Sequence, residues 1–172
     1  LQLSHRLFSA MSSPTLVNAG TNMVKIAFKL NLPIKGIIRN TVFRQFCGGE
    51  SIHECENTIK ILATYGIGTI LDYAVEGENS EDGFDASAAE VMRTIDRAKN
   101  DKDIPFCVFK PTGLASATLL EKIQNNAILS ESENASYKKA LTRWDAIAKK
   151  AYDQNVKLFI DSEESWYQDT ID

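Results

Sequence analysis

The stretch Val156-Lys157-Leu158-Phe159-Ile160-Asp161-Ser162-Glu163-Glu164-Ser165 decides the fold class of this 172-residue chain. It begins as a short apolar, β-branched run, which predicts a buried strand. It then places three carboxylates within four residues. Open α/β sheets and α/β barrels carry their chemistry at the C-terminal ends of their strands. We therefore expect a functional site where this strand ends.

Two earlier stretches share the pattern. Residues 67–73 are an apolar run that leads into Glu76 and Glu78, and residues 104–109 lead into Lys110. Amphipathic helices are predicted between the three strands, over residues 85–98, 117–124 and 134–153. The order predicts an α/β fold with a parallel sheet and right-handed crossovers, in which the charged strand ends share one edge.

Residues 1–46 predict a helical arm in front of this sheet. Apolar residues recur at helical spacing, and Ser12-Ser13-Pro14 and Asn31-Leu32-Pro33 should interrupt the helices. One interpretation is a set of solvated helix faces packed on the main domain, and the other is contact with an anionic membrane surface. The arm is locally basic, through Lys25, Lys29, Lys35, Arg39 and Arg44.

Length, net charge, the lengths of apolar runs and the cysteine content exclude several classes of protein and partner. The length suits one domain with a sizeable core. The formal net charge of −4 gives no basic footprint and argues against a nucleic-acid partner. No apolar run approaches the ~20 residues that span a bilayer, and the first residues lack the layout of a secretory signal. Three cysteines at unrelated spacings argue against a disulfide framework and favour a reducing compartment.

The spacing of the residues argues against two motifs, a dinucleotide-binding fingerprint and a zinc site. Gly66 and Gly68 precede a predicted strand instead of following it, so they do not form a dinucleotide fingerprint. The spacing of Cys47, His53 and Cys55 matches no zinc pattern, and packing explains these residues better.

The strand ends offer two candidate features. Lys110 is either a snorkelling surface residue or a cation held near an anionic or electron-rich cofactor. Asp161, Glu163 and Glu164 repel one another unless cations or donors are supplied, which favours a site over a solvated turn. Alternation places the first two acids on one side and Ser162 and Glu164 on the other. A divalent metal is an alternative ligand, although no histidine stands near these acids.

The chain resembles the proline dehydrogenase family from about residue 46 onward. Each shared motif is weak alone, and the signal lies in their order and combination. The tail Trp166-Tyr167-Gln168-Asp169-Thr170-Ile171-Asp172 also looks like the family's continuation. The motifs are Phe46-Cys47-Gly48-Gly49-Glu50, Thr69-Ile70-Leu71-Asp72-Tyr73, Val75-Glu76-Gly77-Glu78, Phe109-Lys110-Pro111-Thr112-Gly113 and Ile160-Asp161-Ser162-Glu163-Glu164-Ser165.

This resemblance implies a distorted (β/α)8 barrel of the TIM type that holds FAD non-covalently. The implied reaction oxidises L-proline to Δ1-pyrroline-5-carboxylate and passes the electrons to a membrane quinone. Lys110 would be the strand-end lysine beside flavin and substrate, and Asp161 the strand-end aspartate of the active-site network. Glu76 would match the acid that orients the substrate-binding arginines. The implied location is cytoplasmic and membrane-peripheral, with the mitochondrial inner membrane and matrix as the alternative.

The chain also departs from the family. A (β/α)8 barrel needs ~250 residues, whereas three strands are predicted here. The adjacent arginine pair that clamps the proline carboxylate is absent, because the sequence holds no Arg-Arg dipeptide. We expect a helical arm over 1–46 and a partial barrel over 47–172 that does not catalyse alone. The alternatives are a non-catalytic α/β binding or assembly module and a metal-dependent barrel enzyme. An isolated open sheet is expected to aggregate or dimerise.

Overall fold

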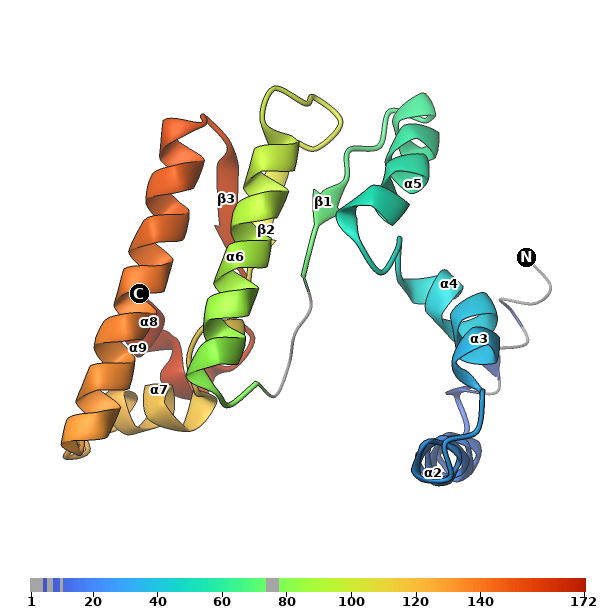
Figure 1. Cartoon of the computed structure of the whole chain (residues 1–172), viewed down its shortest axis with the longest axis horizontal. Coiled ribbons are helices and arrows are strands. Elements are labelled where there is room, and N and C mark those ends of the chain that lie inside the picture. The colour runs from blue at the N-terminus through green and yellow to red at the C-terminus, as the bar shows by residue number, and fades with distance from the viewer. Residues whose placement is uncertain (1–4, 6–7, 10, 74–77) are drawn as a thin grey trace. The chain divides into compact units, whose positions relative to one another are not determined.

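The computed structural model describes residue 5, residues 8–9, residues 11–73 and residues 78–172. The chain divides into two compact units, Leu1–Cys55 and Glu56–Asp172 (Figure 1). Among the described residues, no helix is long and apolar enough to cross a membrane. The domain boundary expected between residues 46 and 47 stays a prediction.

The N-terminal unit is helical. Helix α2 (Pro14–Lys29) begins with a proline, whose missing N–H would have no helical partner at that position. Asn31 follows α2 with a φ of 53°, a left-handed conformation that asparagine tolerates. A helical run then consists of α3 (Lys35–Ile38), the π-helix η1 (Arg39–Phe43) and α4 (Arg44–Phe46). The helices lie where the apolar spacing predicts them. An amphipathic turn is also predicted at Leu3, Leu7 and Phe8, and its first two residues lie outside the described residues.

The C-terminal unit contains an open parallel sheet of three strands, in the order β1-β2-β3. This arrangement confirms the predicted α/β class and the parallel strands. Its elements, in chain order, are α5 (Ile52–Thr64, which starts within the first unit), β1 (Ile70–Leu71), α6 (Glu81–Ala98), β2 (Phe106–Phe109), the 3-10 helix η2 (Pro111–Gly113), α7 (Ala117–Gln124), α8 (Glu131–Asp153), β3 (Lys157–Ile160), the 3-10 helix η3 (Ser165–Tyr167) and α9 (Gln168–Ile171).

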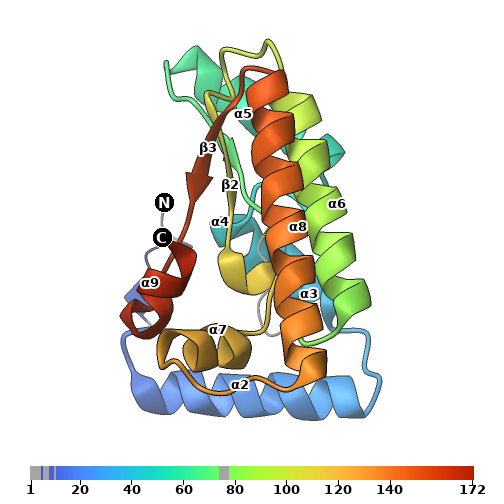
Figure 2. The ribbon, with the colours of Figure 1, turned by 90° about the vertical axis from the view of Figure 1, so that its left-hand side faces the viewer.

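Helices α6 and α8 lie side by side over one face of the sheet (Figure 2). Ile95 of α6, Ile147 of α8 and Cys107 of β2 are each fully buried in the core that this layer forms. The opposite face carries the stacked rings of Phe106 and Phe159, whose centroids are 4.6 Å apart. One face of the sheet is therefore packed, and the other presents apolar side chains.

The strands differ from prediction in burial and length. Strand β3 is not the buried strand expected: Phe159 and Ile160 are 48% and 54% exposed. It pairs with β2 alone, so it is an edge strand with one uncovered face. Strand β1 covers two residues instead of residues 67–73. Pro105 lies opposite Thr69 in the register and has no N–H to extend the ladder.

The helix boundaries also differ. Helix α6 begins at Glu81 within the predicted loop, and the Ser80 side chain accepts the Gly83 N–H at 3.1 Å. Helix α8 begins three residues earlier than predicted, at Glu131, because a capping box at its start extends the helix. Apolar spacing predicts inward side chains on α8 at Leu141, Trp144, Ile147, Ala148 and Ala151. Leu141 is nevertheless 44% exposed, because it lines a groove beside the uncovered edge of β3. Ala148, also predicted inward, is exposed along the same groove.

Candidate active site

The register of the sheet brings the two predicted strand-end residues together. Phe109 of β2 pairs with Ile160 of β3, and the Asp161 N–H donates to the Phe109 carbonyl at 3.0 Å, which extends the ladder by one step. Lys110 and Asp161 are thus neighbours on the same face of the sheet. The Lys110 Nζ donates a hydrogen bond to Asp161 Oδ2 at 2.7 Å.

The acidic segment after β3 splits between two sides, as alternation predicts. Glu163 lies on the same side as Asp161, and Lys110 Nζ also donates to its carboxylate. On the other side, the Ser162 hydroxyl donates to Gln168 Oε1 at 2.7 Å. The Lys110 side chain is 11% exposed, whereas the Asp161 and Glu163 side chains are 44% and 51% exposed. The cation is held close to the sheet, and its two partners face solvent.

This arrangement fixes the charge of Lys110. The hydrogen bonds to Asp161 and then Glu163 raise the Lys110 pKa well above its ordinary value and outweigh the opposing effect of burial. The ammonium group is therefore charged throughout the neutral pH range. The repulsion expected among the acids is offset because the structure supplies them with a cation.

Tyr167 anchors the acidic segment from the other side. It is 1% exposed and packs in a cluster with Ala115, Leu120 and Ala140. Its hydroxyl donates to the Glu164 carboxylate. Burial first, and then that hydrogen bond, raise the Tyr167 pKa above its usual range, so the hydroxyl stays a donor. The sequence analysis assigned Tyr167 no role, although its spacing of four residues to Ile171 marks a helical apolar face.

A second cation with two carboxylate partners lies between α6 and α8. Arg143 of α8 is 6% exposed; its Nε donates to Asp85 Oδ1 at 2.6 Å, and its Nη2 donates to the Glu81 carboxylate. Its Nη1 donates to the Leu114 carbonyl at 3.2 Å, and the guanidinium lies over the Phe84 ring. Arg143 was not among the residues predicted to be functional. The available signal was a basic residue on the inward stripe of α8, whose other buried members are Ala140, Ile147 and Ala151.

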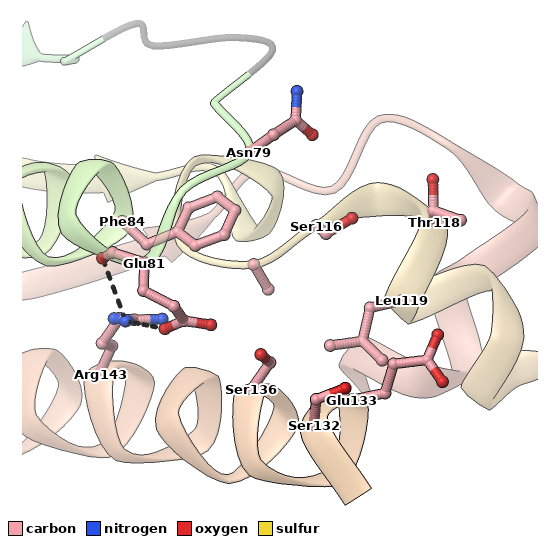
Figure 3. Close-up of a pocket in the computed structure, with 11 residues that line it drawn as sticks. Asn79, Glu81, Phe84, Ser116, Thr118, Leu119, Ser132, Glu133, Ser136 and Arg143 are labelled. Atoms are coloured by element: carbon pink, nitrogen blue, oxygen red, sulfur yellow. Dashed lines mark hydrogen bonds and ion pairs between the residues drawn. The ribbon is translucent and has the colours of Figure 1, made fainter. Parts of the chain in front are cut away.

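The Arg143 cluster borders a cavity of about 210 Å³ between α6, α7 and α8 (Figure 3). Figure 3 shows the guanidinium directed at Glu81 rather than into open space. Burial would lower the Arg143 pKa, but the hydrogen bonds to Glu81 and Asp85 reverse that effect and raise it. The charge of this cluster is satisfied within the protein, which is typical of a structural ion pair.

The space around Lys110 is smaller. Lys110, Asp161 and Glu163 are among the residues that line a hollow with no room for a water-sized molecule, whereas the cavity beside Arg143 holds about 210 Å³. Ligand pockets typically measure about 300–1,000 Å³. The described residues around Lys110 therefore do not enclose a ligand pocket by themselves.

The remaining predicted site residue is Glu76. Glu76 lies outside the described residues. Its described neighbour Glu78 accepts hydrogen bonds from the Asn79 and Ser80 N–H groups, both at 2.8 Å, just before α6 begins. Within residues 11–73 and 78–172 and the few described residues before them, no group of three or more His, Cys, Asp or Glu side chains is arranged to hold a metal ion.

Comparisons with known proteins identify the family. Parallel α/β folds with polar residues at adjacent strand ends are a class dominated by enzymes. The sequence model of the proline dehydrogenase family matches residues 55–172, and the chain belongs to that family.

Two curated relatives illustrate the relationship. The chain is 32% identical over 127 residues to the carbapenem antibiotics biosynthesis protein CarD of Pectobacterium carotovorum subsp. carotovorum, covering 74% of this chain and 34% of that protein. It is 28% identical over 179 aligned positions to proline dehydrogenase 1, mitochondrial, of Dictyostelium discoideum, covering 83% of this chain and 31% of that protein. The chain thus spans about a third of the length of each relative.

Proposed function

We propose that this chain supplies one part of the active site of an FAD-dependent oxidoreductase that oxidises L-proline to Δ1-pyrroline-5-carboxylate and passes the electrons to quinone. Family membership supports this proposal, and so does the relative named as a proline dehydrogenase. The observation that carries it is the Lys110–Asp161 pair at adjacent strand ends. The proposed location is cytoplasmic and membrane-peripheral. The alternative is the mitochondrial inner membrane and matrix, in line with the relative's printed name.

The residues present fit a flavin in part. The uncovered face of the sheet offers the flat stacked rings of Phe106 and Phe159, and Lys110 supplies a fixed positive charge at its end. Bound FAD supplies the hydride acceptor, and the protein contributes orientation and electrostatics. Lys110 would hold the cofactor, because a planar, electron-rich ring system suits an apolar face beside a cation.

The side chains of the site have distinct roles in this proposal. An ammonium group has three N–H donors. Asp161 and Glu163 engage two of them, so one can reach a bound group. The two carboxylates fix the direction of the Lys110 side chain, and Tyr167 holds the segment that carries them through Glu164. The proposed role of Glu76 is to orient substrate-binding arginines supplied by another part of the protein.

We also propose that the sheet is the first part of a (β/α)8 barrel, with residues 1–46 as an arm and 47–172 within the barrel. A groove of about 300 Å³ beside β3 supports this proposal, because it is lined largely by apolar residues of β3 and α8. Trp144 borders the groove, and its buried Nε1 finds no acceptor among the described residues. A further strand and helix would cover this edge.

The test is to isolate the product of the intact gene, weigh it by mass spectrometry and record its visible spectrum. We expect a chain longer than this one, with flavin bands that bleach when L-proline is added. Lys110→Met should slow bleaching by roughly 100-fold or more, because one preorganised charge is worth that much. Lys122→Met, at a lysine paired with Glu133, should leave the rate unchanged. A product of this length without flavin would instead indicate a non-catalytic α/β binding or assembly module.

A further inference from the structure

The turn that carries the acids after β3 is held from two sides in alternation. Asp161 and Glu163 accept hydrogen bonds from Lys110 on one side. The residue between them, Ser162, faces the other side, and its hydroxyl donates to Gln168 Oε1 at 2.7 Å. Because successive side chains of an extended segment point to opposite sides, a contact at Ser162 restricts rotation of the backbone that carries both acids.

Gln168 is itself fixed at the start of α9. Its side-chain amide bridges two groups, because Oε1 accepts the Ser162 hydroxyl and Nε2 donates to Asp172 Oδ1 at 2.7 Å. Ser162 and Gln168 are both half-buried. A hydrogen bond in such surroundings is stronger than one at an exposed pair, since the local dielectric constant is lower.

Helix α9 packs on α7, the helix that follows Lys110 by way of the 3-10 helix η2 (Figure 2). The Thr170 N–H donates to Gln124 Oε1 at 3.0 Å, and the Thr170 hydroxyl donates to the Leu120 carbonyl at 3.1 Å. The contacts therefore form a closed circuit, from Lys110 through α7, α9 and Gln168 to the acids and back to Lys110.

The ion pairs alone do not account for the order of this turn. Ion pairs with solvent-facing carboxylates contribute little to stability, and fixing the backbone of even one residue costs at least as much in conformational entropy. The Ser162 hydrogen bond ties the turn to a packed helix instead. We infer that Gln168 is a positioning residue for Lys110: through Ser162 it holds the turn in the orientation that presents both acids to the ammonium group.

This inference rests on the proposed function in one respect, which is that Lys110 has to face a bound flavin. The contacts themselves need neither flavin nor proline. Chemical labelling of Lys110 therefore tests the inference separately from activity.

The experiment is competitive labelling of lysine side chains with acetic anhydride, followed residue by residue by mass spectrometry on the product of the intact gene. Only the neutral amine reacts, so the hydrogen bonds that raise the Lys110 pKa keep its labelling slow. Gln168→Leu should raise the labelling rate of Lys110 by roughly tenfold or more, since each unit by which the pKa falls is tenfold in neutral amine. Lys122, which pairs with Glu133, should label at the parent rate in the same sample.

Three further variants isolate the hydrogen bond. Ser162→Ala removes it from the other end and should raise the labelling rate as much as Gln168→Leu, and the double variant should exceed neither, because both changes act through one bond. Ser162→Thr keeps the hydroxyl and should label like the parent. Gln154→Leu is the matched control, because the Gln154 Nε2 donates to Asp96 Oδ1 at 2.7 Å, before β3 begins rather than after it ends.

The inference is wrong if Gln168→Leu and Ser162→Ala leave the labelling of Lys110 unchanged. It is also wrong if all lysines label faster together in both variants, which would mean that the whole fold has loosened. In an active holoenzyme, Gln168→Leu should also slow bleaching by proline, although by less than Lys110→Met does. A parent protein without flavin would overturn the proposed function, and the labelling comparison would still decide this inference.

Discussion

The C-terminal unit contains two clusters of the same composition, one cation with two carboxylates, in different surroundings. Arg143 is enclosed between α6 and α8, where a backbone carbonyl and an aromatic ring complete its contacts. Lys110 stands at the end of the sheet's uncovered face, and its carboxylate partners are about half exposed. All the contacts of the first cluster join parts of the unit to one another. In the second cluster, Asp161 and Glu163 accept hydrogen bonds from two of the three N–H donors of Lys110, which leaves one donor for a bound group.

The difference shows how burial and partners separate a structural ion pair from a candidate site. A buried arginine with four of its five N–H donors engaged, as Arg143 has, cannot respond to a ligand without loss of packing. A lysine held by two solvent-facing acids keeps its charge and can exchange a partner for a bound anion. Loss of the two cations should therefore affect different properties of the protein.

The largest effect on stability is expected at Arg143. Arg143→Ala should lower the free energy of unfolding by about 3 kcal/mol, because it removes a buried cation together with its hydrogen bonds to Glu81, Asp85 and the Leu114 carbonyl. Arg93→Ala is the matched control on α6: that side chain is 62% exposed beside Glu90. Its loss should cost less than about 0.5 kcal/mol. Urea unfolding measures both, and equal losses would remove the distinction drawn between the clusters.

Tyr167 should come next. Tyr167→Phe keeps the ring in its cluster and removes the hydroxyl that Glu164 accepts, which should cost about 1.5 kcal/mol. Tyr152→Phe, at a residue 86% exposed, should change nothing measurable. If Tyr167→Phe were neutral in urea unfolding, the acidic segment would have to be held by other contacts.

Acid should weaken the Arg143 cluster by a smaller amount. Burial would raise the Glu81 pKa, but the hydrogen bonds from Arg143 and Ser136 outweigh it and lower that pKa below its usual 4.5. A depressed carboxylate pKa contributes stability that is present above the unfolded value and is lost as the pH falls through the folded value. We expect Glu81→Gln to be less stable than the parent chain at pH near 7, and the difference to shrink as the pH falls below the usual carboxylate pKa of 4.5. A constant gap between the two unfolding curves would contradict this linkage.

Lys110 should have the smallest effect on stability. Lys110→Met should change the free energy of unfolding by less than about 1 kcal/mol, because both acids remain solvated when the lysine is lost. Thermal and urea unfolding of the chain would show this change. A loss as large as that of Arg143→Ala would mean that Lys110 serves the fold, and the case for a site at the strand ends would fail.

Much of the fold was predictable because it depends on local chemistry. The strand–helix order follows from apolar periodicity, and the boundaries of α7 match the prediction of residues 117–124. Asparagines with positive φ follow α2, α6, α7 and α8, where the sequence marks the helix ends. The starts of α6 and α8 were placed too late, although Ser80 and Ser130 are capping residues visible in the sequence.

The site was predictable in part. A charged residue directly after an apolar strand identified Lys110 and Asp161, and parallel pairing then made them neighbours. The prediction that β3 is buried was wrong because burial depends on how many strands flank β3. No pattern within a strand encodes that number. Arg143 was missed because its partners are 58 and 62 residues distant in the sequence.

The layered arrangement of α6, β2, α8 and β3 has a consequence for biosynthesis. Helix α6 contacts β2 and helix α8 contacts β3, and contacts between α6 and α8 and between β2 and β3 join the two pairs around Ile95, Cys107 and Ile147. Such a core can form on the ribosome as soon as β3 emerges, since N-terminal parts fold first at synthesis rates of about 5–20 residues per second. On the uncovered face of the sheet, the stacked rings of Phe106 and Phe159 would then give the nascent chain an apolar surface of the kind that chaperones bind.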